Sequence, residues 1–268
     1  MNAETLLLGL LQGVTEFLPV SSSGHLALAK AVTGHGEMSL AFDLVLHLAT
    51  LLASFFYFFH DIASILLEWL YGFINANARR WLGWRFGWAV ILGTLVTGPI
   101  GIFLKPLVNS SSDNMLILGG NFLITGALLL SSKFFAPGDS AVSARHGIFV
   151  GLLQGLSVFP GVSRSGATIW AGRLSGLSGV EAFRFSFLLS MPAILGASLY
   201  EAKDLGGLGG FLGALPSGWF PAALAAFASG LASLTLLRRL VEGGGWWFFS
   251  LYCIALGCAV VVYSIIGV

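Results

Sequence analysis

The sequence predicts an all-α polytopic membrane protein with an inverted-topology repeat, each half a re-entrant helix hairpin plus three transmembrane helices. The 268 residues are 56% hydrophobic and only 9% charged, with a mean hydropathy of +0.89. Soluble domains carry about 25% charged residues, so we expect lipid to surround most of this chain. The chain also contains six long apolar stretches and two interrupted apolar stretches that resemble each other. Together they predict a single membrane domain, residues 1–268.

Six stretches are predicted to span the bilayer, because each approaches the 20 or so apolar residues that a spanning helix needs at 1.5 Å per residue. They are residues 40–60, 85–105, 114–133, 182–201, 217–237 and 246–266. Residues 61–84 are more polar and contain tryptophan, which favours a connecting helix that lies partly at the interface.

Two further apolar regions, residues 3–33 and 147–176, are interrupted by proline, glycine and serine. The interruptions run from Pro19 to His25 and from Pro160 to Gly166. Broken backbone at membrane depth is tolerated only inside protein or beside a water-filled cavity. Both regions are therefore predicted to be re-entrant helix–loop–helix hairpins.

The two hairpins are copies of each other. Residues 9–25 align without a gap on residues 151–167, with ten identities that include the shared Gly-Leu-Leu-Gln-Gly segment. Three predicted spans follow each copy, and an odd number of spans turns the second copy upside down relative to the first. The sequence thus predicts an inverted repeat, with repeat 1 at about 1–140 and repeat 2 at about 141–268.

Basic residues predict the orientation of the chain. On this topology nine lysines and arginines fall on one side and three on the other. The richer side is expected to be cytoplasmic, which places both termini outside. The richer side carries Arg79, Arg80, Arg85, Lys133, Arg145, Arg173, Arg184, Arg238 and Arg239, and the other carries Lys30, Lys105 and Lys203.

The hairpins concentrate the polar groups that can carry chemistry. Gln12 and Glu16 are four residues apart and share one face of the first helix. Each serine-rich turn opens a second helix, whose free N–H groups favour an anion. Arg164 adds a planar guanidinium group, whose N–H donors match the spacing of phosphate oxygens. An arginine inside the membrane is costly, so we expect it to be functional. His25 can exchange a proton near neutral pH.

These groups predict a phosphate cradle with an acid–base pair and a hydroxyl nucleophile. The expected phosphate-binding residues are Ser21, Ser23, Ser163, Arg164, Ser165 and Thr168. Serine beside glycine and proline also serves in turns and helix caps, so Ser21 and Ser23 have a purely structural alternative. We expect Glu16 and Arg164 to converge on His25. Asp43 and His47 are second-tier candidates. They either line the same cavity or only pair with each other.

The two motifs resemble the undecaprenyl-diphosphate phosphatases of the bacitracin-resistance type. The first family motif, Glu/Gln-x-x-x-Glu followed by Pro-Val-Ser-Ser-x-Gly-His, is matched by Gln12, Glu16 and the segment Pro19 to His25. The second, Pro-Gly-x-Ser-Arg-Ser-x-x-Thr, is matched from Pro160 to Thr168. Segments 42–47 and 185–189 also look like family segments, so the similarity covers essentially the whole chain.

The resemblance implies a bacterial plasma-membrane enzyme that hydrolyses the terminal phosphate of undecaprenyl diphosphate and recycles the cell-wall lipid carrier. It implies Glu16, Ser22, His25 and Arg164 as catalytic residues, and Mg²⁺ or Ca²⁺ as cofactor. Glu16 and Gln12 are the expected metal ligands, although an amide is a poorer ligand than a carboxylate. Ser22 activated by His25 is the expected nucleophile, and direct attack by water is the close alternative.

Other partners and functions follow from the same observations. A polyprenyl diphosphate and membrane lipid are the expected partners, and a homodimer is left open. Because 13 basic residues face 12 acidic ones, no nucleic-acid binding is expected. Secondary transporters are also built from inverted repeats with broken helices at mid-membrane. A transporter or flippase for a polyprenyl phosphate or small anion is therefore the competing function.

Overall fold

The computed structural model describes residues 3–33, 39–111 and 114–266, and within these ranges every regular element is helical. The α-helices are α1 (Ala3–Phe17), α2 (Ser22–Thr33), α3 (Leu40–Tyr57), α4 (Phe59–Ile74), α5 (Leu82–Ser111), α6 (Met115–Ser131), α7 (Ala144–Leu156), α8 (Arg164–Leu174), α9 (Gly179–Glu201), α10 (Gly207–Gly213), α11 (Trp219–Glu242) and α12 (Phe249–Ile266). Short 3₁₀ turns are η1 (Ala76–Arg80), η2 (Ser132–Phe134), η3 (Ala202–Leu205) and η4 (Trp246–Phe248).

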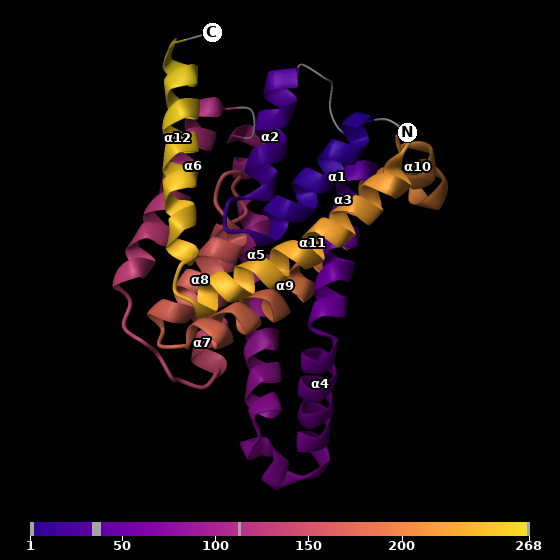
Figure 1. Ribbon diagram of the computed structural model, residues 1–268. Coiled ribbons are helices and arrows are strands. Elements are labelled where there is room, and N and C mark those ends of the chain that lie inside the picture. Colours follow the sequence, from indigo (N-terminus) through magenta and orange to yellow (C-terminus); the bar gives the residue numbers. More distant parts are fainter. Residues whose placement is uncertain (1–2, 34–38, 112–113, 267–268) are drawn as a thin grey trace.

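The six predicted spans are confirmed as helical segments long and apolar enough to cross a membrane. They are Leu40–Tyr57, Leu82–Ser111, Met115–Phe134, Gly179–Glu201, Trp219–Glu242 and Trp246–Ile266. The polar connection 61–84 forms α4 and η1, and α4 packs along α5. Figure 1 shows this pair reaching away from the other helices, with the start of α1 and the end of α12 at the opposite end of the molecule.

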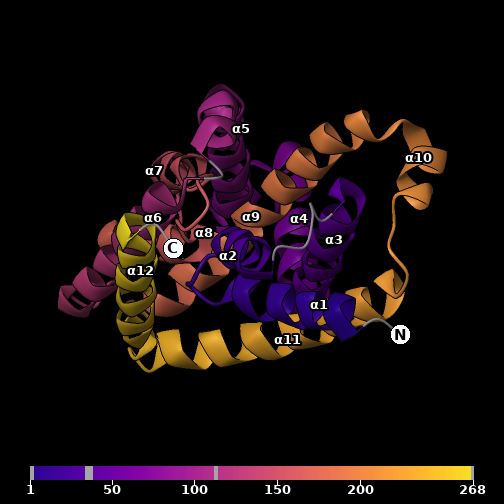
Figure 2. The ribbon, with the colours of Figure 1, turned by 90° about the horizontal axis from the view of Figure 1, so that it is seen from above.

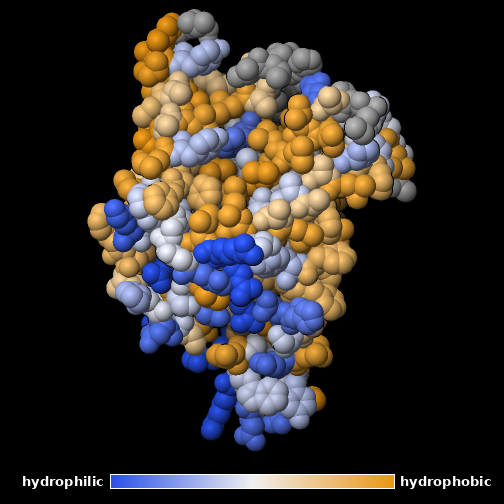
Figure 3. Space-filling model, viewed as in Figure 1, coloured by the Kyte–Doolittle hydropathy of each residue, from blue (hydrophilic) through white to orange (hydrophobic). Residues whose placement is uncertain are grey.

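The outer surface is apolar, as the composition requires. Large hydrophobic side chains such as Phe103, Ile74 and Leu67 are more than two-thirds exposed. Figure 3 shows hydrophobic residues over the upper part of one face and hydrophilic residues gathered towards the lower end. An apolar surface of this extent is unstable in water and suits a bilayer.

Both broken regions form pairs of short helices. α1 and α2 contain 15 and 12 residues, and α7 and α8 contain 13 and 11. None of the four reaches the roughly 20 residues of a spanning helix. The chain breaks at residues 18–21 in the first pair and 157–163 in the second. These breaks overlap the predicted interruptions but start and end earlier, because α2 and α8 begin inside the predicted segments.

The repeated glycines bring the hairpin helices close to their neighbours. A Cβ at Gly9 would lie 2.2 Å from the carbonyl oxygen of Ala222 on α11, and one at Gly151 would lie 2.5 Å from that of Gly93 on α5. Small residues allow such close approach between membrane helices. The Gly-Leu-Leu-Gln-Gly segments therefore dock α1 on α11 and α7 on α5, and Figure 2 shows α1 lying along α11.

Helix α9 forms the centre of the bundle, in contact with α3, α5, α8 and α11. Its Phe183 and Phe187 are buried and pack on Phe17 and Phe58, with ring centres 4.9–6.0 Å apart. Phe17 ends α1 one residue after Glu16. The aromatic core thus fixes the end of α1 that carries the carboxylate.

Candidate active site

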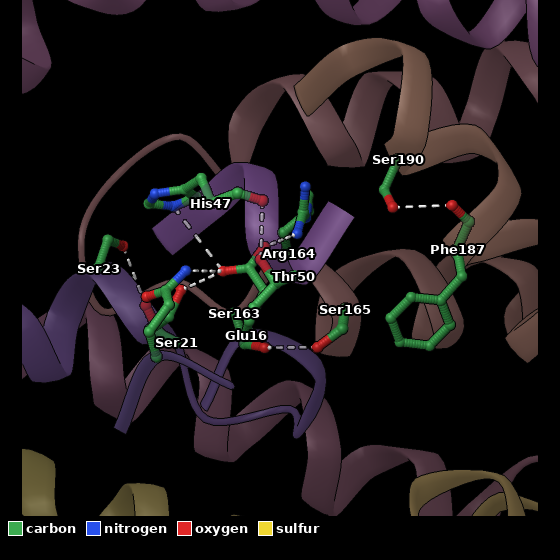
Figure 4. Close-up of polar contacts among 12 residues, drawn as sticks. Glu16, Ser21, Ser23, His47, Thr50, Ser163, Arg164, Ser165, Phe187 and Ser190 are labelled. Carbon is green, nitrogen blue, oxygen red and sulfur yellow. Dashed lines mark hydrogen bonds and ion pairs between the residues drawn. The ribbon is translucent and has the colours of Figure 1, made fainter. Parts of the chain in front are cut away.

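The carboxylate of Glu16 is the centre of the polar cluster. Its Oε2 accepts hydrogen bonds from Ser22 Oγ at 2.6 Å and from Gln12 Nε2 at 3.1 Å. Its Oε1 forms an ion pair and hydrogen bond with Arg164 Nη2. Glu16 is only 6% exposed, and a carboxylate so buried needs a cation and several donors to stay charged. Figure 4 shows these contacts converging on it.

The two hairpins meet at their turns. Ser21 Oγ accepts a hydrogen bond from the Gly161 backbone N–H at 3.0 Å. A Cβ at Gly24 would lie 2.8 Å from the same nitrogen, so only glycine allows this approach. Ser21 has a φ of +69°, unlike every other described residue apart from some glycines. Such a backbone conformation costs energy and persists only where the surroundings enforce it. The first turn is therefore held in a strained shape by the second.

Most of the predicted phosphate-binding hydroxyls already have partners within the hairpins. Ser21 and Ser163 cap their helices by accepting from the N–H groups of Gly24 (3.4 Å) and Gly166 (3.1 Å). Ser165 Oγ lies 3.2 Å from Ser163 Oγ, and Thr168 Oγ1 lies 2.5 Å from Ser186 Oγ. Ser23 is exposed. Capping is thus the contact observed for Ser21 and Ser163, and a phosphate-binding role for the set stays a prediction.

His25 does not lie where the sequence suggested. Its Nδ1 is 2.8 Å from the Ser21 carbonyl oxygen, and its Nε2 is 2.6 Å from the Tyr252 hydroxyl. Its ring stacks on Tyr252, with ring centres 5.7 Å apart. The expectation that Glu16 and Arg164 converge on His25 is therefore wrong, because α2 turns this side chain towards α12. Ser22, which His25 was expected to activate, is bonded to Glu16 instead.

The imidazole beside Glu16 is that of His47 on α3. His47 Nε2 lies 3.9 Å from Glu16 Oε2, and its Nδ1 lies 3.7 Å from Asp43 Oδ1 and 3.0 Å from the Asp43 carbonyl oxygen. The sequence left open whether this second-tier pair lines the site or pairs internally. It does both, since the i, i+4 spacing that joins the two residues also aims the imidazole at Glu16.

Sequence reasoning missed three residues that position the site. Tyr252 on α12 bonds to His25, and no motif marked it. Thr125 on α6 donates to the Gly161 carbonyl and accepts from the Ser163 N–H, at 2.8 and 2.9 Å. Asn121, one turn earlier, donates to the Pro160 carbonyl at 2.8 Å. Two polar residues four apart in an apolar span were the available signal for this pair.

Comparisons with known proteins agree with the motifs. The family described as Bacitracin resistance protein BacA matches residues 5–259. The chain belongs to the BacA family. A relative from Methanosphaera stadtmanae, named undecaprenyl-diphosphatase, is 36% identical over 97% of each chain. Proteins of the same name from a Nocardioides species and Thermobifida fusca are also 36% identical, over 99% of this chain and 97% and 91% of theirs.

The two hairpin motifs are similar in sequence but differ at Glu16 and at the position of Ser22 and Arg164, which both contact Glu16. In the alignment of the two repeats, Glu16 corresponds to Val158, His25 to Ala167 and Ser22 to Arg164. Each hairpin therefore contributes a different group to one shared site. The first supplies the carboxylate and the hydroxyl, and the second supplies the permanent positive charge.

Proposed function

We propose that this chain is an integral-membrane undecaprenyl-diphosphate phosphatase, which releases the terminal phosphate, recycles the cell-wall lipid carrier and confers bacitracin resistance. BacA membership and the names of its relatives support this activity. The observation that carries the proposal is the Ser22 hydroxyl, 2.6 Å from the Glu16 carboxylate, which is buried and also paired with Arg164. A hydroxyl bonded to a base is the usual arrangement of an activated nucleophile.

In the proposed reaction Glu16, rather than His25, accepts the Ser22 proton. Ser22 Oγ attacks the terminal phosphorus, the bond from that phosphorus to the bridging oxygen breaks, and undecaprenyl phosphate leaves. Water then hydrolyses the phosphoserine and releases inorganic phosphate. Direct attack by a water that donates its proton to Glu16 is the alternative. Both routes require Glu16 within hydrogen-bond reach of the proton it takes.

Arg164 stabilises the charge that develops on the phosphate oxygens. Its guanidinium carries five N–H donors, so it can hold Glu16 and phosphate oxygens together. Ser22 and Arg164 begin α2 and α8, whose first N–H groups favour an anion. We propose that Ser23, Ser163, Ser165 and Thr168 complete the cradle, and that Ser21 contributes through the turn it caps. His25 contributes to catalysis while it is hydrogen-bonded to the Tyr252 hydroxyl.

A divalent cation fits the site through two residues. Gln12 Oε1 is buried and has no hydrogen-bond donor among the described residues, and hard cations prefer oxygen ligands. No group of three or more His, Cys, Asp or Glu residues forms a metal cluster in the described ranges. We therefore propose that Mg²⁺ or Ca²⁺ is held by Gln12, Glu16 and substrate oxygens. When bound, the cation would offset the negative charge of the diphosphate.

The architecture is proposed to be an inverted repeat, with residues 1–140 and 141–268 as its halves and two re-entrant hairpins. Packing between the halves supports the proposal, because the first helix of each half packs on a spanning helix of the other half. Helix α1 packs on α11, and α7 packs on α5. Helices α6 and α12, which correspond in the two halves, pack on each other. The basic residue bias supports a cytoplasmic location for the turn between α4 and α5, with both termini outside the plasma membrane.

The transporter or flippase alternative is not favoured, because an anion path has no need of a serine hydrogen-bonded to a buried carboxylate. The deciding experiment measures inorganic phosphate released from undecaprenyl diphosphate, or a shorter isoprenyl diphosphate, by the purified chain in detergent. We expect release with Mg²⁺ or Ca²⁺ present. If no phosphate appears with either cation, while the protein is folded, the enzyme proposal fails.

A further inference from the structure

A cavity with charged side chains in its lining lies away from the Glu16 cluster. Its volume is about 470 Å³, and it lies between the end of α6 with η2, the end of α8, the start of α9, the end of α11 and η4. Figure 1 shows α11 turning into α12 at this corner of the bundle. Its charged lining residues are Lys133, Arg173 and Glu242. The proposed phosphatase chemistry uses none of them.

Positive charge dominates this cavity. Lys133 Nζ lies over the Trp247 ring, 4.6 Å from its centre. Arg173 donates to the carbonyl oxygens of Leu177 and Ala136 at 3.1 and 3.2 Å, which fixes its guanidinium at the wall. The carboxylate of Glu242 is already engaged, because it accepts a hydrogen bond from Arg238 Nε at 2.8 Å.

The start of α9 adds backbone donors to the same cavity. Ser178 caps this 23-residue helix by accepting from the Glu181 N–H at 3.1 Å. Ser178, Gly179 and Val180 line the cavity, and the first N–H groups of a helix have no partner within it. A cavity with two cations and a helix N-terminus is suited to an anion with several oxygens, such as a phosphate group.

The position of the cavity favours a lipid as the source of that phosphate. It lies where the spans Met115–Phe134 and Gly179–Glu201 meet the start of Trp246–Ile266, at the end of the bundle where lysine and arginine are concentrated. Phe134 and Phe248 beside it are 81% and 57% exposed, and can contact acyl chains. Basic pockets between membrane helices on the cytoplasmic side bind anionic headgroups.

We propose that this cavity binds the phosphate group of an anionic phospholipid. Lys133, Arg173 and the first N–H groups of α9 contact the phosphate oxygens, and the Trp247 ring lies against the lysine ammonium. The cavity is separate from the Glu16 cluster, because Arg164 and Arg173 are nine residues apart on α8, about 14 Å at the usual helical rise.

Lys133→Gln is the variant that tests the proposal. Lys133 is chosen over Arg173 because Arg173 also donates hydrogen bonds to backbone carbonyls. Lys105→Gln is the matched control, since Lys105 Nζ lies 4.4 Å from the centre of the Tyr200 ring in the same kind of contact, outside this cavity. The full chain is purified in detergent, and its unfolding temperature and lipid adducts are measured against phosphatidylglycerol, phosphatidylcholine and inorganic phosphate. Both variants are first checked for an unfolding temperature near that of the wild type without added ligand.

We expect phosphatidylglycerol to bind the wild type and Lys105→Gln alike, and Lys133→Gln at least about fivefold more weakly. Phosphatidylcholine should bind less tightly to all three proteins. If inorganic phosphate alone shows the same dependence on Lys133, the phosphate site stands and its source is the free ion. Equal binding of every ligand by wild type and Lys133→Gln overturns the proposal, as does an equal loss in both lysine variants. None of these readouts depends on phosphatase activity.

Discussion

Ser22 and Arg164 occupy corresponding positions in the two hairpins, and both side chains contact the carboxylate of Glu16. Each is the first residue of a short helix that follows a serine-capped turn. A neutral hydroxyl and a fixed cation thus contact different oxygens of one buried carboxylate. Five predictions follow from this geometry and its supports.

Arg164→Lys should lower kcat/KM at least about tenfold, which corresponds to about 1.4 kcal/mol of transition-state stabilisation. Lysine keeps the charge but loses the planar fork that can hold Glu16 and phosphate oxygens together. Steady-state hydrolysis of an isoprenyl diphosphate measures the loss. Near wild-type turnover would show that a point charge is sufficient.

Ser22→Ala should abolish both turnover and any trapped covalent phosphate, because it removes the proposed nucleophile. Ser23→Ala is the matched control, since Ser23 is the next residue and is exposed. The contact of its hydroxyl with Ser21 Oγ is long, at 3.4 Å. Ser23→Ala should retain measurable activity. Ser21→Ala should also retain activity, but the protein should lose some stability because the hydrogen bond from the Gly161 N–H is removed. Substantial hydrolysis by Ser22→Ala would favour direct attack by water.

Gln12→Glu should lower the Mg²⁺ concentration for half-maximal activity several-fold, because a hard cation prefers a charged oxygen ligand. Activity at saturating Mg²⁺ should change little. Without the cation, two carboxylates at these neighbouring positions would repel each other, so chelation should inhibit the variant more than the wild type. Gln12→Leu should weaken the metal response. Superimposable Mg²⁺ titrations of all three proteins would make Gln12 a packing residue.

Tyr252→Phe should lower kcat about fivefold, since one hydrogen bond to His25 contributes about 1 kcal/mol to holding the Ser21–Ser22 turn. KM and the unfolding temperature should change little. Tyr263→Phe, an exposed tyrosine on the same helix, is the control. If Tyr252→Phe has wild-type kcat while His25→Gln does not, His25 acts without its tyrosine partner.

Gly9→Ala should destabilise the fold by about 1–3 kcal/mol, because its Cβ would overlap the Ala222 carbonyl and push α1 away from α11. Gly120→Ala on α6 is the control, since a Cβ there meets nothing within 4 Å. That change should be neutral or stabilising, given the higher helix propensity of alanine. Thermal unfolding in detergent compares them, and equal unfolding temperatures would contradict close packing at Gly9.

The sequence alone determined the helical class, the six spans and the two broken regions. These follow from hydropathy and from proline, glycine and serine spacing, which act locally along the chain. It also grouped Glu16, Ser22 and Arg164 in one site, because the polar residues of the two hairpins were expected to converge. Gln12 and Glu16 were placed together by helical periodicity alone.

Tertiary structure alone decided which histidine faces the carboxylate. His25 ends the first motif and His47 ends the segment 42–47. The orientation of α2 against α12 turns His25 towards Tyr252, and α3 brings His47 to Glu16. It also decided that Ser21 and Ser163 cap helices and that Thr125 holds the second turn. Side-chain direction depends on how helices distant in sequence pack against each other, and no local pattern in the chain encodes that rotation.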